Sequence, residues 1–365
     1  MASNAPPEEP PSKALVTSVI LFYIVAALAM VMANKAVLNV TDVPLFFLLI
    51  QLIIAVLLFG IADIARISSE RLTFDLKTCK GLAYVVALNV VGLSFNNYTL
   101  KYVDASFYQV ARGLVLPFTV GVSFVMLHSR PSPLILVSCA IVTVGFFIGV
   151  LLDGTPLSLV GIIFGVASSS ITALASVVIK QSLPVVNGST ILLAWYANLL
   201  SAIALAPIVL IAGEGPAILA LLSGNPSSDT AIRAAVDGTT SQLKTFLWGS
   251  LITGVIGFLM SIAGPLSIKV TSPISHMISS AVRGVAQSFL GLWYFKDVIS
   301  SGRAVSIAIV LGGSIYYTWV KNKESEAAAA DTAAYNRVAM DDLENGKLDM
   351  DEGPDSPEEL ERPTR

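Results

Sequence analysis

The stretch FYQVARGLVLPF, residues 107–118, has the composition of a membrane helix but carries a guanidinium group at Arg112. Apolar runs of about 20 residues recur on both sides of it, and each could cross about 30 Å of hydrocarbon as a helix. The chain of 365 residues is 55% hydrophobic and 13% charged, whereas a soluble domain carries about 25% charged residues. The sequence therefore predicts an all-α integral membrane protein, since barrel strands would show short alternating segments.

The apolar runs predict ten transmembrane helices: 14–38, 44–65, 81–100, 105–127, 133–152, 157–180, 189–212, 245–267, 273–294 and 302–320. The first span follows the Pro-rich, acidic head MASNAPPEEPPSK. A secretory signal would begin with basic residues instead, so this span is expected to be retained. Two cysteines, Cys79 and Cys139, form neither a disulfide framework nor a metal site.

Charge is distributed unevenly along the chain. Residues 323–365 contain thirteen acidic and five basic residues, whereas the rest contains twelve acidic and seventeen basic residues. The acidic tail, 322–365, lacks apolar periodicity and is predicted to be disordered. Ten spans place both termini on one side, and the basic link 66–80 makes that side cytosolic by the positive-inside rule. The link 213–244 would then be luminal.

A weak internal repeat is present. A shift of 168 residues aligns Lys101 with Lys269 and Tyr108 with His276, and Lys35 and Lys180 end the first and sixth spans. Five spans per repeat is an odd number, so the second repeat must be inverted, as in many secondary transporters. The predicted organisation is a cytosolic N-terminal tail, two inverted five-helix repeats and the acidic cytosolic tail, at 1–13, 14–152, 153–321 and 322–365.

Two arginines lie inside predicted spans. Arg112 is the eighth residue of its span, and Arg283 is near the centre of another. A charge at the helix centre costs about 2.5–3.5 kcal/mol by insertion scales, so each arginine is expected to face a cavity; the alternative is a packed arginine that caps stray carbonyls. Tyr108 precedes Arg112 by one turn on the same face. Helical spacing places further polar residues on the face of Arg283: His276, Ser280 and Gln287.

Acidic residues are absent from the middle of the predicted spans, because Asp63, Asp104 and Asp153 lie at span edges. A cationic core without anions indicates a substrate that supplies negative charge. The planar fork of arginine suits phosphate, to which it donates two parallel hydrogen bonds. Exchange of one organic phosphate for another would need no coupling proton. The small Ser and Thr residues of these helices could line the cavity or could join helices together.

Several of these stretches resemble one family. NKAVL (34–38) resembles the NKxxL signature of nucleotide-sugar and triose-phosphate translocators. LSFNNYTLKYVDASFYQVARGL (93–114) and SIKVTSPISHMISSAVRGVAQ (267–287) resemble segments of the GDP-fucose transporter branch. These proteins belong to the drug/metabolite transporter superfamily, whose fold is ten helices in two inverted repeats. The resemblance implies a Golgi antiporter that brings GDP-fucose in and takes GMP out, without a cofactor or metal.

The resemblance also implies binding residues. The helix-seven motif FYNN, which contacts guanine, aligns with WYAN (195–198), so that Tyr196 and Asn198 match. The helix-nine motif GALNK of the GDP-mannose branch aligns with SAVR (280–283), where arginine replaces lysine. The expected partners are a nucleotide sugar, a nucleoside monophosphate and the lipid membrane, with a homodimer as one possible assembly and no nucleic acid. The predicted substrate-binding residues are Tyr23, Lys35, Asn97, Tyr108, Arg112, Lys180, Tyr196, Asn198, His276, Ser280, Arg283 and Gln287.

Other functions stay open at this point. Within the superfamily, the substrate could be GDP-mannose, a UDP-sugar or a triose phosphate. A membrane glycosyltransferase would need acid/base residues or a metal site on a luminal loop, and the loop 213–244 contains Glu214, Asp229 and Asp237 but no His. A receptor or scaffold would not need buried arginines in both halves. A transporter rather than an enzyme is therefore expected.

Overall fold

The computed structural model describes residues 13–67, 71–153, 158–223, 242–270 and 273–344. These residues form helices, and no strand occurs among them. The Cα positions divide the chain into two units, Met1–Thr318 and Trp319–Arg365. The last helix, α14 (Ser301–Glu344), begins in the first unit and ends in the second.

The first unit contains the helices that correspond to the predicted spans. Span ends differ from helix ends by a few residues, except that α14 continues to Glu344, well beyond the predicted end of the tenth span at residue 320. The predicted fourth span, 105–127, is divided into α5 and α6. The helices are α1 (Lys13–Val40), α2 (Pro44–Ile64), α3 (Leu76–Gly81), α4 (Ala83–Tyr102), α5 (Ala105–Gly113), α6 (Val115–Leu127), α7 (Pro133–Leu151), α8 (Leu159–Ser182), the 3₁₀-helix η1 (Leu183–Val186), α9 (Thr190–Ile211), α10 (Gly215–Ser223), α12 (Gln242–Val270) and α13 (Pro273–Tyr294).

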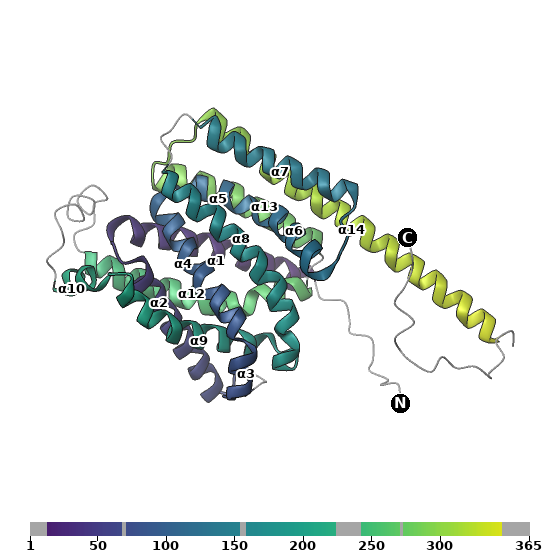
Figure 1. The fold of residues 1–365 in the computed structure, drawn as a ribbon, viewed down its shortest axis with the longest axis horizontal. Helices are drawn as coiled ribbons and strands as arrows, with labels where there is room; N and C mark the ends of the chain where they lie inside the picture. The colour runs from purple at the N-terminus through teal and green to yellow at the C-terminus, as the bar shows by residue number, and fades with distance from the viewer. Residues whose placement is uncertain (1–12, 68–70, 154–157, 224–241, 271–272, 345–365) are drawn as a thin grey trace. The chain divides into compact units, whose positions relative to one another are not determined.

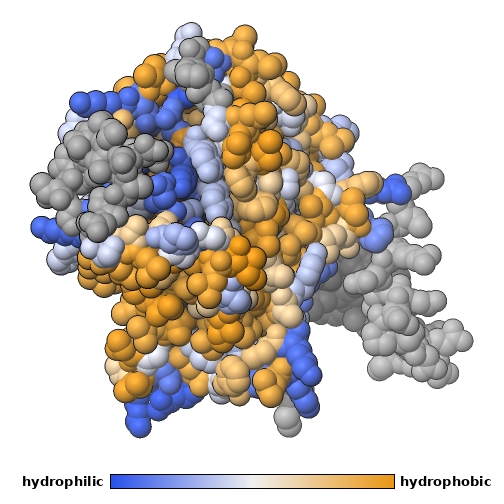
Figure 2. Space-filling view, turned by 60° about the vertical axis from the view of Figure 1, so that its left-hand side comes forward, coloured by the Kyte–Doolittle hydropathy of each residue, from blue (hydrophilic) through white to orange (hydrophobic). Residues whose placement is uncertain are grey.

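Eight segments of the described residues are long and apolar enough to cross a membrane. Seven are helices of this list, with α5 and α6 counted together, and the eighth is Ser301–Ala327 of α14. The two other predicted spans, on α4 and α13, are helices of 20 and 22 residues. Both contain more polar side chains, such as Asn96 and Arg283, and both line the cavity described below. Large apolar side chains such as Leu57 and Phe147 are exposed, and Figure 2 shows hydrophobic residues covering most of one face. A surface of this kind is suited to contact with lipid.

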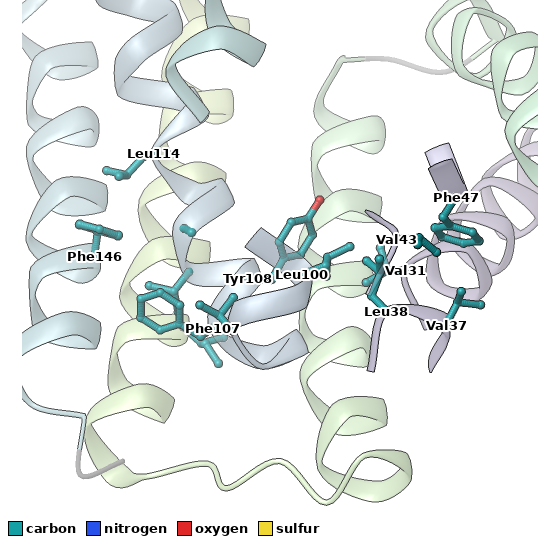
Figure 3. Packing of buried hydrophobic residues seen from close by; sticks show 14 of the residues in the cluster. Val31, Val37, Leu38, Val43, Phe47, Leu100, Phe107, Tyr108, Leu114 and Phe146 are labelled. Atoms are coloured by element: carbon teal, nitrogen blue, oxygen red, sulfur yellow. The ribbon is translucent and has the colours of Figure 1, made fainter. Parts of the chain in front are cut away.

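The helices of the first unit pack as a bundle (Figure 1). Helix α1 packs against α12 and α13, α4 packs against α8 and α9, and α13 packs against α5. One core cluster joins α1, α2, α4, α5 and α7, and Figure 3 shows its residues Leu38, Phe47, Leu100 and Phe107. Because α5 meets α1, α8 and α13, residues on its faces lie at the centre of the bundle.

The break between α5 and α6 falls at Leu114, two residues after Arg112. The backbone N–H of Leu114 donates to Ala111 O at 3.2 Å, a bond one residue shorter than the α-helical pattern. Pro117 has no backbone N–H, and its ring crowds the carbonyl of Gly113. Proline therefore accounts for the interruption of the predicted fourth span next to its arginine.

The structure differs from the sequence-based predictions in two segments. Helix α10 occupies part of the predicted loop 213–244, and Glu214 precedes it. Both carboxylate oxygens of Glu214 accept N–H groups at the start of α2, from Leu45 and Phe46 at 2.9 Å each, where four donors of a helix have no partner within the helix. Burial raises the pKa of Glu214, although these two hydrogen bonds and Lys101 act in the opposite direction.

The predicted disorder of the acidic tail is wrong for residues 323–344, because α14 continues as a helix to Glu344. Its sequence there contains ESEAAAADTAA, and alanine has the highest helix propensity. Asn322 also donates a hydrogen bond to Glu326, four residues later, at 2.6 Å. Helix propensity therefore accounts for this helix, since the segment lacks the hydrophobic periodicity on which the predicted spans rest.

A buried ion-pair cluster joins the starts of α5 and α14 to the end of α7. The side chain of Arg303 is 0% exposed; its Nε lies 2.7 Å from Asp153 and its Nη1 lies 2.8 Å from Asp104. The same Nη1 donates to Ser106 Oγ at 2.9 Å. Asp297 accepts the backbone N–H of Ser106, and burial together with the charge of Asp104 raises the pKa of Asp297. The cluster fixes the turn from which α5 begins.

Arg303→Met should destabilise the protein by about 3–5 kcal/mol, because it leaves the fully buried carboxylate of Asp153 without its cation. The double variant Arg303→Met, Asp153→Leu should recover part of this loss, since it removes both buried charges. Thermal unfolding of the purified protein measures both effects, and Arg130→Met, in an exposed link, is the control. A single variant as stable as the wild type would show that the cluster contributes little.

Candidate functional site

A cavity of about 450 Å³ lies inside the first unit, between α1, α2, α4, α5, α9, α12 and α13. This volume is within the usual range of ligand pockets, about 300–1,000 Å³. Apolar residues such as Leu48 and Leu93 form part of its wall. The polar part of the wall consists chiefly of amides: Asn34, Gln51, Asn89, Asn96, Asn97 and Asn198.

Arg112 reaches this cavity from the last turn of α5. Its guanidinium carbon lies 5.7 Å from the ring centroid of Tyr108, one turn earlier. Figure 3 shows Phe107 and Tyr108 on different sides of α5, and the Tyr108 hydroxyl donates to Asn96 Oδ1 at 3.1 Å. The cation is therefore held against an aromatic ring that is itself fixed to α4.

Arg283 reaches the same cavity from α13. Its guanidinium carbon lies 5.8 Å from the ring centroid of Tyr23, and Nη1 lies 3.5 Å from the Tyr23 hydroxyl. Its Nε is buried and has no hydrogen-bond partner within the described part of the chain. Arg112 and Arg283 are close enough to repel each other. Since none of the described lining residues is Asp or Glu, the two cations favour an anionic ligand.

The amides of the wall are partly ordered by one another. Gln51 Nε2 donates to Asn34 Oδ1 at 2.8 Å and to Thr253 Oγ1 at 2.7 Å. Asn198 Nδ2 donates to Ala194 O at 2.7 Å. The side-chain oxygen of Asn198 is then the atom that can accept a hydrogen bond from a ligand. An amide-rich wall can match the donors and acceptors of a nucleobase edge.

The structure brings together six of the predicted binding residues at this cavity: Tyr23, Asn97, Tyr108, Arg112, Asn198 and Arg283. The side chains of three others lie outside the described residues: Lys180, His276 and Ser280. The remaining three, which are Lys35, Tyr196 and Gln287, are described and have other partners.

Lys35 and Gln287 both contact the turn between α4 and α5. Lys35 Nζ donates to the carbonyl oxygens of Leu100 and Val103, each at 2.7 Å, and Gln287 Nε2 donates to Ala105 O at 2.9 Å. The last carbonyls of a helix have no partner within that helix, and here a buried cation supplies one. Sequence alone does not separate such a capping lysine from a ligand-binding lysine.

Tyr196 lies away from the cavity although its helix lines it. Its hydroxyl accepts the backbone N–H of Asp75 at 2.8 Å, and its ring stacks with Phe74 at 6.4 Å between centroids. Asp75 caps α3, and hydrogen bonds from the backbone of Lys77 and Thr78 lower its pKa. Tyr196 is therefore not among the described lining residues of the cavity, and it joins α9 to the link before α3.

Six polar residues of the cavity wall were not predicted from the sequence. A usable signal existed for some of them, since Gln51 is a single polar residue within the apolar run of α2. Asn89 and Asn96 are seven residues apart on α4 and so share a face. The missed residues are Asn34, Gln51, Asn89, Asn96, Thr253 and Ser261.

Comparisons with known proteins identify the family of this chain. A profile of the Triose-phosphate Transporter family matches residues 14–318. GDP-fucose transporter 1 of Dictyostelium discoideum is 32% identical over 315 residues, with 84% of this chain and 81% of that protein covered. GDP-fucose transporter 1 of Mus musculus is 30% identical, with 87% and 86% covered. The Golgi GDP-fucose transporter of Drosophila melanogaster is 31% identical, with 84% and 90% covered.

The family profile spans nearly all of the first unit, and the relatives are matched over most of their own length. The matched region includes every described residue of the arginine-containing cavity. This chain therefore belongs to the triose-phosphate transporter family, a family of transporters.

Proposed function

We propose that this protein is a Golgi antiporter that exchanges cytosolic GDP-fucose for luminal GMP by alternating access. The observation that carries the proposal is the pair Arg112 and Arg283 at a cavity whose described wall contains no carboxylate. A phosphorylated ligand would supply the missing negative charge and would accept paired hydrogen bonds from the guanidinium groups. The names of the Mus, Dictyostelium and Drosophila relatives support GDP-fucose, and the Drosophila name supports the Golgi.

The proposed architecture is ten membrane spans in two inverted repeats, with both termini in the cytosol. Helix contacts support the repeat. In the proposed repeat, α1, α2 and α4 of the first half correspond to α8, α9 and α12 of the second. The contact of α4 with α8 then corresponds to that of α12 with α1, and the contact of α2 with α12 to that of α9 with α4. A binding site between the halves can then open to either side as one repeat tilts against the other. The link 213–244 would face the lumen.

Other substrates of the same superfamily remain the alternative: GDP-mannose, a UDP-sugar or a triose phosphate. The amides around Asn198 and Asn89 favour a nucleotide over a three-carbon phosphate, since a triose phosphate would leave most of them without a ligand partner. Asn198 is also the residue that matches the guanine-contacting motif. Guanine is therefore the proposed base.

Exchange is expected to be obligatory, because an empty carrier would have to reorient with two unpaired cations in its cavity. Proteoliposomes preloaded with GMP should take up labelled GDP-fucose much faster than empty ones. A pH gradient should add little, since the described cavity wall offers no carboxylate to carry a proton. Uptake driven by the pH gradient and indifferent to preloading would rule out this mechanism.

Binding of phosphate by the arginines can be measured without transport. GMP at 100 times its Kd should stabilise the wild-type protein by about 2.7 kcal/mol, whereas guanosine should give little protection. Arg112→Ala and Arg283→Ala should lose most of this gain, and Arg283→Lys should keep part of it because a point charge replaces the fork. Arg130→Ala, at an exposed position, is the control. Full protection of both alanine variants would make the arginines structural.

Base recognition by Asn198 can be tested by competition. Asn198→Ala should weaken GMP binding roughly 5- to 150-fold, the cost of about 1–3 kcal/mol for an unpaired buried group. In the wild type, GMP should inhibit GDP-fucose uptake better than UMP or CMP. Tyr196→Phe is the matched control, because the Tyr196 hydroxyl bonds Asp75 outside the cavity, and it should leave base preference unchanged. Equal inhibition by the three monophosphates would remove guanine from the proposal.

A further inference from the structure

A second cavity, of about 290 Å³, lies between α5, α6, α13 and α14 in the first unit. The residues that line it and those that line the larger cavity overlap at only two positions, Arg112 and Arg283. The two guanidinium groups therefore stand at the junction of two spaces. A ligand whose middle is bound by both arginines could place one of its ends in each cavity.

The two cavities differ in chemistry. The larger one is rich in amides, whereas the smaller one has hydroxyl groups from Thr119, Ser314 and Tyr317, one amide from Gln109, and an aliphatic wall. Thr119 Oγ1 donates to Val115 O at 2.7 Å, and Ser314 Oγ donates to Val310 O at 2.8 Å. Because each hydroxyl proton is already engaged, both oxygens face a ligand as hydrogen-bond acceptors.

Acceptor oxygens beside an aliphatic wall suit a sugar ring. The hydroxyl groups of a hexose can donate to Thr119 and Ser314, and its C–H face can pack on Val310 and Leu311. A nucleobase would instead require several in-plane donors and acceptors, which the larger cavity provides. Size is consistent with this division, since the smaller cavity has about 290 Å³ and the larger about 450 Å³.

We infer that a nucleotide sugar binds across the arginine pair, with its nucleoside in the larger cavity and its hexose in the smaller one. The inference rests on the proposed function and assigns the sugar subsite to α6 and α14. The diphosphate lies between them, where the buried Nε of Arg283 has no partner among the described residues. A nucleoside monophosphate occupies the larger cavity alone, so the smaller one is filled and emptied once in each exchange.

The test fills the smaller cavity from two sides, with Ser314→Phe on α14 and Thr119→Phe on α6. Equilibrium binding of GDP-fucose, GDP and GMP is measured on the purified full-length protein. Each variant should weaken GDP-fucose on the order of tenfold, by overpacking of the subsite, and should leave GDP and GMP unchanged. Ile315→Phe is the matched control, since Ile315 follows Ser314 on α14 and its side chain is 43% exposed.

Retained GMP binding in the variants also shows that they are folded. The inference is overturned if both variants bind GDP-fucose as the wild type does, or if they weaken GMP as much as GDP-fucose. In either case the wild type still binds both ligands and the proposed function stands. If the wild type binds neither GDP-fucose nor GMP, the proposed function fails, and the subsite assignment fails with it.

Discussion

A charge removed from water must find a partner, and this constraint orders the whole first unit. Arg303 is fully buried and is neutralised by Asp153 and Asp104 within the protein. Arg112 and Arg283 face cavities whose described walls contain no acidic residue. The same side-chain type thus has two outcomes in one bundle. Arg303 is part of the fixed framework, whereas the charges of the other two arginines are assigned to a ligand in the function proposed above.

The turn between α4 and α5 is where that framework meets the site. Lys35 from α1 contacts its carbonyls, Gln287 from α13 contacts Ala105 O, and Arg303 from α14 contacts the side chains of the first residues of α5. Helices that are far apart in sequence therefore fix one short segment. Because α5 carries Arg112 only a few residues later, the position of the cation depends on contacts formed by three other helices.

Much of the fold follows from local sequence. The apolar runs located the predicted spans to within a few residues, except at the end of α14, which continues to Glu344. Arg112 and Arg283 were conspicuous because a charge inside an apolar run is costly. Partners could not be foreseen in the same way. Lys35 was predicted to bind substrate, yet its ammonium group donates to carbonyl oxygens 65 and 68 residues away. Tyr196 matched a family motif, but its hydroxyl group accepts the backbone N–H of Asp75. Periodicity identifies a helix face, whereas the neighbour of that face is decided by packing.

The divided fourth span has a mechanical consequence. An intact helix resists bending through its ladder of hydrogen bonds, and Pro117 removes one rung at Gly113. Helix α5 contains six buried residues, whereas α6 contains none. The buried residues of the fourth span thus lie on one side of the gap, and its bending stiffness is lowest at the gap, beside Arg112. A load applied to α6 would flex the chain at this hinge and leave the guanidinium group of Arg112 in place.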